Sequence, residues 1–359
     1  MSLFPFGKNT AVLGVDIGTS SIKIVEVTKK GEKTVVTNYG WVELPAKDKR
    51  QSIAEEVYQP DHIKRNLEAL LSTMKPSTKS AATALPGLSS LVTLIELPKM
   101  SEQEINEAIP FEAQKYIPTS LDEVALSWEI IGKRESGADE GMMSGEKTQV
   151  LMVAAPKKEV ERFEKIFDGL SIDVHSIEVE TISLVHALVG NDTGQFIVID
   201  IGARATSILL VENGTIKISR NIDVGGREIS STIADNMNIS WDRAESLKKS
   251  EKNILSSRET AISLPSIVMT IAEVQRVSSA GMNEKRKEDM QVILSGGTAR
   301  MVGLREYIET ETGIKTIIGN PWARLHYEEK IAPYVEAIGP AFSVAIGLAL
   351  KGVKDMEKK

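Results

Sequence analysis

The chain has 359 residues, of which 42% are hydrophobic and 26% charged, the balance of a folded protein with a sizeable core and room for two domains. Its formal net charge of −7 and its scattered Lys and Arg argue against a nucleic-acid-binding surface, and we interpret the short basic cluster at 285–287 as a solvated face. Because the chain has no cysteine, a disulfide framework, a thiolate metal site and a Cys nucleophile are excluded.

The remaining composition gives no sign of a metal centre or a membrane segment. The initial segment Met1 to Lys8 has too short an apolar run for a secretory signal, and the longest mainly apolar run, Ala337 to Leu350, is too short to span a bilayer and contains Pro340. We therefore expect a cytoplasmic protein. Histidines without HExxH-like spacing, which we interpret as structural, are His62, His175, His186 and His326.

The first predicted feature is a strand over 11–15 that ends in Asp16, followed by a turn of small and hydroxyl residues and a second strand from Ile22. Such a turn can present backbone N–H groups and hydroxyls to an anion, while the carboxylate can hold a hydrated cation. The same pattern also makes an ordinary hairpin, and alone it favours that interpretation. A third strand over 33–43 and an amphipathic helix over 60–74 follow.

A second unit is predicted over about 81–175. It begins with strands over 81–85 and 91–97. A helix follows, opened by a capping box from Ser101 to Glu104, and Pro110 must kink or restart it. The rest of the unit is a strand, an aperiodic loop that we expect to be mobile, a strand, a helix and a strand, over 124–131, 132–149, 150–155, 157–170 and 172–179.

The opening pattern then returns after a short helix. A strand over 195–200 ends in Asp200, Gly202 and a small-residue turn to Thr206 follow, and two more strands are joined by the hairpin signal Asn213-Gly214. A duplicated meander with Asp and Gly at its first turn indicates two similar lobes that point two phosphate-binding hairpins into one cleft. The repetition favours nucleotide binding over coincidence.

The last third is predicted to be mainly helical. Asp223 to Arg227 enters a helix, and the next helix carries Glu245 and Lys248, whose spacing alone favours a plain surface pair. After a long helix over 263–280, a strand runs into Ser295-Gly-Gly-Thr298, where two glycines let a ligand approach a helix N-terminus; a close strand-to-helix turn is an equally good interpretation. Further elements are expected over 302–310, 314–318 and 344–350.

Three of these motifs, in this order, resemble the actin-like ATPase superfamily: Asp16-Ile-Gly-Thr and Asp200-Ile-Gly as phosphate motifs and Gly296-Gly-Thr298 as the adenosine motif. The segments 96–100 and 111–118 look like the inserted subdomain 1C of FtsA-like proteins. With Phe6-Gly-Lys8 near its start, the chain is similar to the PilM family of type IV pilus assembly proteins. The match covers nearly the whole chain.

The resemblance implies an α/β fold: an actin-like, duplicated ribonuclease H-like, two-lobed fold with an FtsA-type inserted subdomain 1C. It divides the chain into subdomain 1A over 9–80, 176–194 and 337–353, subdomain 1C over 81–175, and a second lobe of subdomains 2A and 2B over 195–336.

The resemblance also implies a site for ATP and Mg²⁺ between the lobes. Asp16 and Asp200 would organise Mg²⁺ through water. The residues implied to contact phosphate are Gly18, Thr19, Ser20, Lys23, Gly202 and Thr206. Those implied to surround the nucleoside are Gly225, Gly226, Glu245, Lys248, Gly296, Gly297 and Thr298.

Hydrolysis is expected to be slow or absent. The second turn reads Gly202-Ala-Arg-Ala-Thr206 where hydrolysing relatives carry glycines, and Arg204 could pair with a phosphate or only face solvent. The candidate for a catalytic base is Glu180, for which a plain carboxylate at a helix start is the competing interpretation. At most, this would be a slow ATPase.

The implied partner is a PilN-like membrane protein, whose short cytoplasmic N-terminal tail would dock in a groove between subdomains 1A and 1C. The protein would join other pilus proteins at the inner face of the inner membrane and touch the membrane only through partners. An FtsA-like division protein is the alternative, but it would end in an amphipathic membrane helix, whereas 351–359 is charged and lacks an apolar face. A sugar or acid kinase would need a positioned base beyond the two motif aspartates.

Overall fold

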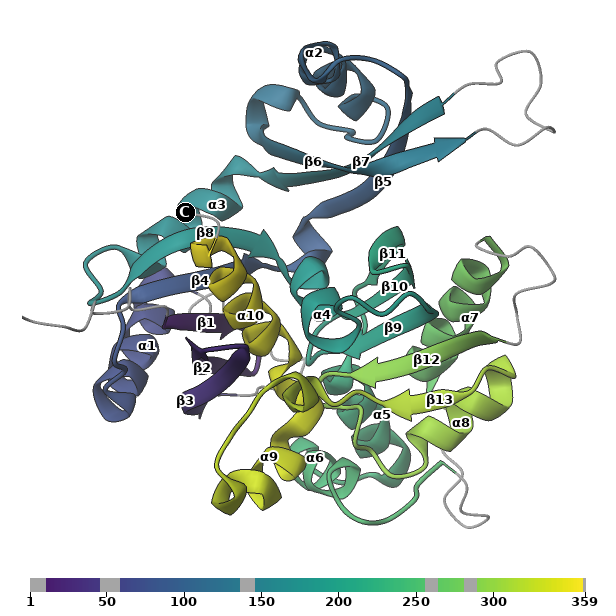
Figure 1. Cartoon of the computed structure of the whole chain (residues 1–359). Helices are drawn as coiled ribbons and strands as arrows, with labels where there is room; N and C mark the ends of the chain where they lie inside the picture. The colour runs from purple at the N-terminus through teal and green to yellow at the C-terminus, as the bar shows by residue number, and fades with distance from the viewer. Residues whose placement is uncertain (1–10, 46–58, 136–145, 256–263, 281–288, 358–359) are drawn as a thin grey trace, which may run out of the picture.

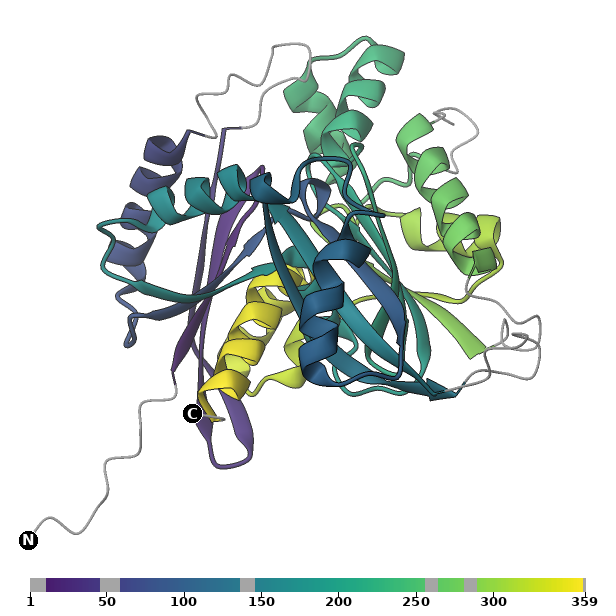
Figure 2. The same cartoon turned by 90° about the horizontal axis from the view of Figure 1, so that it is seen from above.

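The structure is a computed structural model that describes residues 11–45, 59–135, 146–255, 264–280 and 289–357. Two lobes, each built on one sheet, lie side by side, and an inserted subdomain sits above them (Figure 1). The same arrangement seen from above shows the insert in front of both lobes (Figure 2). The Phe6-Gly-Lys8 start, the basic cluster at 285–287 and the centre of the predicted loop, 136–145, lie outside the described residues.

The first lobe contains a sheet in the order β3-β2-β1-β4-β8. The first three strands form the predicted antiparallel meander, and β4 and β8 extend it in parallel. Every residue of β1 is buried, because helices cover both faces of the sheet. The strands are β1 (Val12–Ile17), β2 (Ser21–Lys30), β3 (Lys33–Glu43), β4 (Ser80–Leu85) and β8 (Asp173–Val179). The covering helices are α1 (Pro60–Met74), α3 (Lys157–Phe167), α4 (Glu180–Leu188) and α10 (Ser343–Glu357).

The second lobe repeats this sheet, in the order β11-β10-β9-β12-β13. Each position has its counterpart, so that β9 and β10 stand where β1 and β2 stand in the first lobe, and the predicted duplication is confirmed. The strands are β9 (Gln195–Ile201), β10 (Thr206–Glu212), β11 (Thr215–Ile222), β12 (Met290–Ser295) and β13 (Thr316–Ile318).

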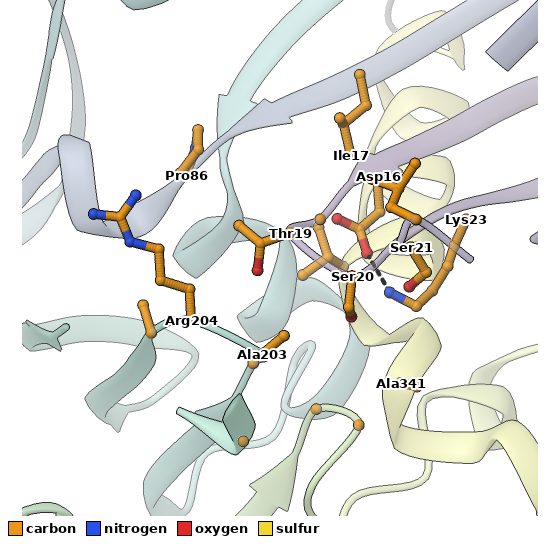
Figure 3. A pocket seen from close by; sticks show the side chains of 18 of the residues that line it. Asp16, Ile17, Thr19, Ser20, Ser21, Lys23, Pro86, Ala203, Arg204 and Ala341 are labelled. Atoms are coloured by element: carbon orange, nitrogen blue, oxygen red, sulfur yellow. Dashed lines mark hydrogen bonds and ion pairs between the residues drawn. The ribbon is translucent and has the colours of Figure 1, made fainter. Parts of the chain in front are cut away.

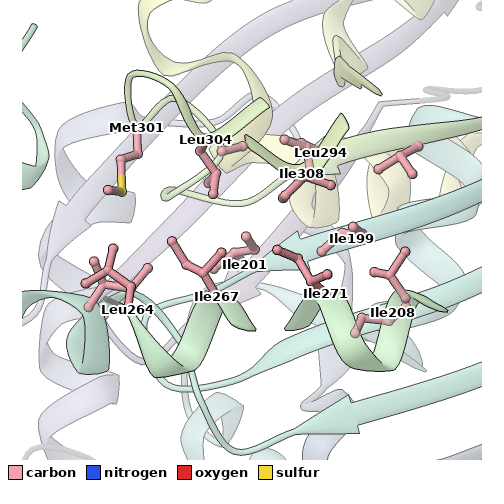
Figure 4. Packing of buried hydrophobic residues seen from close by; sticks show 14 of the residues in the cluster. Ile199, Ile201, Ile208, Leu264, Ile267, Ile271, Leu294, Met301, Leu304 and Ile308 are labelled. Carbon is pink, nitrogen blue, oxygen red and sulfur yellow. The ribbon is translucent and has the colours of Figure 1, made fainter. Parts of the chain in front are cut away.

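The core of the second lobe lies between its sheet and its helices. Ile267 and Ile271 point from α7 (Pro265–Ala280) toward Ile199 and Ile201 of β9, and Ile308 of α8 (Leu304–Thr312) completes the layer (Figure 4). The remaining helices on this side are α5 (Gly226–Met237) and α6 (Trp241–Lys248). On the other face, α4 and α10 contribute side chains to a cluster shared with both sheets, so these two helices join the lobes.

The insert is a three-stranded sheet, β5-β7-β6, covered on one face by α2 (Glu102–Ala113). The predicted capping box is present, because Ser101 and Glu104 bond each other's backbone N–H. A restart at Pro110 is not observed, since α2 continues through it to Ala113. The strands are β5 (Leu91–Pro98), β6 (Val124–Glu135) and β7 (Glu146–Pro156), so strand residues replace both ends of the predicted 132–149 loop.

Two segments pack differently from what the predicted division of the chain implies. Strand β4 pairs with β1, so residues 81–85 belong to the first lobe and not to the insert, and α3 likewise packs on α1. At the other end, the segment from Trp322 to Val335 was assigned to the second lobe, yet both side chains are buried against first-lobe strands. Local sequence pattern indicates that a strand exists but not which partner it chooses.

The C-terminal stretch Glu329–Glu357 is helical over 29 residues and, by length and composition, could span a membrane. This stretch is longer than the predicted apolar run, Ala337 to Leu350, and includes it. However, 56% of its most apolar window is buried within the fold, where α10 packs against β1 and α4, and this packing accounts for the apolar character. Val353 is buried too, so the end of α10 does have an apolar face, turned inward.

Candidate functional site

The two Asp-x-Gly turns face each other across a cleft of ≈ 1480 Å³ between the lobes. Both turns, the start of α5 and the turn after β12 line this cleft, so the structure brings together residues that are almost 300 positions apart in sequence. The predicted site residues on its wall are Asp16, Gly18, Thr19, Ser20, Lys23, Glu180, Asp200, Gly202, Gly226, Glu245, Lys248, Gly296, Gly297 and Thr298.

A positively charged side chain, that of Lys23, lies beside the first turn. The N–H of Gly18 donates to the carbonyl of Ser21 (3.0 Å) and closes the turn, which leaves the hydroxyl side chains of Thr19 and Ser20 at the cleft. Asp16 and Lys23 are cross-strand partners, and Lys23 Nζ lies 3.1 Å from Asp16 Oδ2 with both side chains largely buried (Figure 3). This is a charge arrangement that can receive a phosphate at Lys23 and a cation at Asp16.

The second turn is closed by the same type of backbone hydrogen bond, but no lysine lies opposite its aspartate. The N–H of Gly202 donates to the carbonyl of Ala205 (2.9 Å), and the cross-strand partner of Asp200 is Ser207. Arg204 points toward Pro86 and away from Asp16 and Lys23 (Figure 3), and its Nε pairs with Asp223 at 3.0 Å. Of the two interpretations of Arg204, the structure therefore favours the exposed one.

Two predicted residues support the second turn from behind instead of lining the cleft. Thr206 is 1% exposed, and its hydroxyl donates to the carbonyl of Val224 (2.8 Å). Gly225 packs so closely that a Cβ there would lie 2.7 Å from the carbonyl oxygen of Gly202. Both hold the entry to α5 against the turn.

Three carboxyl groups influence one another at the inner end of the cleft. Burial, with a further contribution from Asp16, raises the pKa of Glu180 to about 8, and burial raises the pKa of Asp200 to about 6. Glu180 Oε2 accepts a hydrogen bond from the N–H of Gly87 (3.0 Å). Among the described residues, no group of three or more histidines and carboxylates is placed to hold a metal ion.

Glu245 and Lys248 do not form the surface pair that their spacing favours. Lys248 is 8% exposed and its Nζ donates to Glu245 Oε2 (2.7 Å) and to the carbonyl of Gly226 (2.9 Å), while Ser230 donates to the same carboxylate. Burial lowers the pKa of Lys248; burial acts to raise the pKa of Glu245, but Lys248 and Ser230 lower it overall. The pair ties α6 to α5 at the cleft wall.

Arg227, which the sequence did not single out as a site residue, reaches across the cleft. It follows the Gly225-Gly226 pair in the first turn of α5, is 5% exposed, and donates a hydrogen bond from Nη2 to the carbonyl of Thr19 in the opposite lobe. The sequence signal for Arg227 is its place directly after two glycines at the start of a helix. The bond joins the two lobes at the first turn.

A second, smaller cavity of ≈ 590 Å³ lies where three parts of the molecule meet. Its walls are mainly apolar and come from β6 and β7 of the insert, from β8, α4 and α10 of the first lobe, and from the hairpin between β10 and β11. We call it the insert groove. Its side chains include Leu126, Trp128, Val153, Ile177, Ile182 and Ile216.

The duplicated sheets and the cleft between them define an actin-like fold. The solved structure of the ethanolamine utilization protein EutJ from Carboxydothermus hydrogenoformans shares it with a TM-score of 0.55, 18% identity and coverage of 97% of this chain and 91% of that one. MreB5 of Spiroplasma citri, bound to ADP, does so with a TM-score of 0.52, 12% identity and coverage of 97% and 99%. These likenesses confirm the expected fold.

Within this class, the chain belongs to the type IV pilus assembly protein PilM family, whose sequence model matches residues 14–353. It also resembles the structure of a PilM-PilN type IV pilus biogenesis complex, with a TM-score of 0.78, 26% identity and coverage of 95% of this chain and 98% of that one. The cell division protein FtsA of Streptococcus pneumoniae is 20% identical over 342 residues, which are 84% of this chain and 74% of FtsA. The predicted family is confirmed, and the division-protein alternative is the weaker one.

Proposed function

We propose that this member of the PilM family is a cytoplasmic ATP-binding scaffold, recruited to the inner face of the inner membrane by the N-terminal tail of a PilN-like protein. Membership of a pilus assembly family supports the role, and the similar PilM-PilN complex supports the partner. The single observation that carries the nucleotide is the pair of Gly-closed turns on either side of one cleft, with Lys23 and Asp16 at the first.

In this proposal the phosphates of ATP lie between the turns at Gly18 and Gly202. Lys23 and the hydroxyls of Thr19 and Ser20 would contact the phosphates, and Asp16 and Asp200 would hold a hydrated Mg²⁺. Gly296 and Gly297 would let the nucleoside approach the backbone next to the buried Lys248.

We also propose that hydrolysis is slow or absent, and the state of Glu180 supports this. With a pKa of about 8, Glu180 is mostly protonated at pH 7, and a protonated carboxyl cannot accept a proton from an attacking water. One oxygen of the Glu180 carboxyl group also accepts a hydrogen bond from the N–H of Gly87. We therefore assign Glu180 a poor catalytic capacity in the isolated protein.

Thermal unfolding with and without Mg-ATP tests the nucleotide site, because a ligand that binds only the folded state raises its stability. The wild type should unfold at a higher temperature with Mg-ATP, and Asp16→Ala should lose most of that gain. A wild type whose melting temperature ignores Mg-ATP would refute the nucleotide proposal.

For the peptide we propose the insert groove, whose mainly apolar walls suit a segment that docks apolar side chains. The PilN-like N-terminal tail from the same organism should bind in a calorimetric titration. Leu126→Asp, which places a charge on the groove wall, should abolish that binding, whereas Val268→Asp on the exposed face of α7 should leave it intact. Absence of wild-type binding at high micromolar peptide would refute this part.

We also propose that the insert spans 86–156, because β4 and α3 pack in the first lobe. Subdomain 1A then takes 11–85, 157–194 and 320–357, and the second lobe takes 195–319. Limited proteolysis that separates the insert should leave β4 and α3 attached to the first lobe.

A further inference from the structure

The insert groove contains more negative than positive charge. Four ionisable side chains line its otherwise apolar wall: Glu129, Glu178, His186 and Lys351. Lys351 is already committed, because its Nζ bonds both carboxylate oxygens of Asp355 on the next turn of α10 (2.5 and 2.6 Å). Burial lowers the pKa of His186 to about 4, so this ring is neutral at pH 7. The described residues that line the groove thus include two glutamates and one lysine, and this lysine already pairs with Asp355.

Glu178 is the inner of the two lining glutamates. It lies near the end of β8, half-buried, and Oε2 accepts a hydrogen bond from Ser183 at 3.3 Å. Burial raises the pKa of Glu178 to about 7, with Asp355 and Glu129 adding to the rise against Lys351 and Ser183. Glu129 is exposed on β6 at the rim. The cation acting on Glu178 is thus Lys351, and that lysine is itself bonded to Asp355.

We infer that Glu178 selects the docked peptide by pairing with a Lys or Arg side chain of that peptide, which sets the register of the apolar residues in the groove. The inference rests on the proposed peptide function. An apolar segment laid over Glu178 removes its remaining water, and an ionised carboxylate buried without a partner is costly. A cation on the segment offsets that cost and makes the wrong register unfavourable, because another register buries Glu178 beneath an aliphatic side chain.

The test is a double-mutant cycle between the groove and the peptide. The probe is a synthetic peptide with the N-terminal cytoplasmic sequence of the PilN-like protein from the same organism, together with variants in which each Lys or Arg is replaced by Met. The protein variants are Glu178→Gln, which keeps shape and removes charge, Glu129→Gln at the rim, and Glu306→Gln on the distant helix α8. Affinity is measured by calorimetry, and thermal unfolding checks each protein variant.

Glu178→Gln should weaken binding of the parent peptide about 10- to 100-fold. One Met peptide should lose a similar factor on the wild type and little more on Glu178→Gln. Glu129→Gln should change affinity less than about threefold, as is typical of an exposed charge, and Glu306→Gln should not change it.

The outcomes separate the two proposals. If the wild type binds no peptide, the peptide function fails and this inference with it. The wild type could also bind the peptide while the effects of Glu178→Gln and of every Lys-to-Met or Arg-to-Met change simply add. In that case the groove remains the peptide site and the pairing with Glu178 is refuted. Should Glu178→Gln fold poorly, the peptide series on the wild type still decides, since unchanged affinity for every Met peptide would refute the pairing.

Discussion

The turn between β1 and β2 and the turn between β9 and β10 share a backbone and differ in charge. In each, a glycine N–H donates to the carbonyl three residues later, at Ser21 in one and Ala205 in the other. Yet Asp16 faces Lys23, whereas Asp200 faces Ser207. The main-chain geometry survives in both copies because it depends on hydrogen bonds and glycine, while the side chains are free to diverge. Of the two turns, the first alone thus has a lysine opposite its motif aspartate.

The central strands of the two sheets differ as well. Two residues before each motif aspartate stands Gly14 in β1 and Val198 in β9. A Cβ on Gly14 would lie 1.9 Å from the carbonyl oxygen of Ala345, because α10 crosses β1 at backbone contact. Val198 instead fills an apolar cluster beside α4. In the first lobe, the lack of a side chain at Gly14 lets α10 pack directly against the backbone of β1.

Substitutions at these two positions should give the largest effect. We expect Gly14→Val to cost about 3 kcal/mol or more of unfolding free energy, because the clash is with backbone and cannot be relieved by a rotamer change. Val198→Ala, a cavity mutation in the other lobe, should cost about 1–3 kcal/mol. Chemical denaturation measures both. A Gly14→Val protein as stable as the wild type would show that α10 does not approach β1 this closely.

Replacing Lys23 by serine, the residue at the equivalent position of the second lobe, should remove much of the nucleotide affinity. Lys23→Ser removes the charged donor, and we expect the dissociation constant for Mg-ATP to rise about 10- to 100-fold, since a charge-assisted hydrogen bond contributes about 1.5–3 kcal/mol. Ser207→Ala is the matched control and should bind Mg-ATP like the wild type. Equal loss in both variants would mean that the lobes share the phosphate evenly.

The carboxyl excess near the first turn should appear in the pH dependence of stability. The pKa of Glu180 is about 8 in the folded protein and near its ordinary value of 4.5 in the unfolded chain, so the folded state binds more protons between these values. Its contribution to stability is therefore complete below about pH 4.5 and is lost as the pH rises to about 8. Glu180→Gln, which cannot ionise, should gain several degrees in melting temperature relative to wild type between pH 5 and pH 8.

This comparison is made without nucleotide or Mg²⁺. The exposed Glu161→Gln should run parallel to the wild type over the same pH range. A constant difference between Glu180→Gln and wild type would contradict the raised pKa.

The smallest effect is expected at the second turn. Arg204→Ala should change the Mg-ATP dissociation constant by less than about twofold and stability by less than about 0.5 kcal/mol, because an exposed ion pair contributes little. Arg227→Met provides the contrast, since it removes the bond to the Thr19 carbonyl that links the lobes. A large loss of affinity in Arg204→Ala would place this guanidinium on the phosphate after all.

Much of this could be predicted from the sequence because the informative signals are local. The capping box at Ser101, the Asn213-Gly214 hairpin and the repeated Asp-x-Gly turns each lie within a few residues, and each has the predicted structure. The pairing of β4 with β1 could not be predicted, since parallel partners are joined by a long connection that leaves no periodic trace.

Within the site, the same limit applies to single side chains. Helical spacing placed Glu245 and Lys248 on one face but could not tell that this face is turned into the cleft. Nor could the sequence show that Arg227 reaches across to Thr19, because their proximity depends on how the lobes are set against each other.

Helix α10 has a consequence for the order in which the chain can fold. It supplies the buried partner of β1, and glycines let it approach both neighbours, with Gly14 under Ala345 and Gly347 against the Ser183 carbonyl. During synthesis, β1 leaves the ribosome more than 300 residues before this helix, whereas the second lobe, contiguous in sequence from Gln195 to Gly319, completes its main core earlier. The first lobe to be made is the last to close.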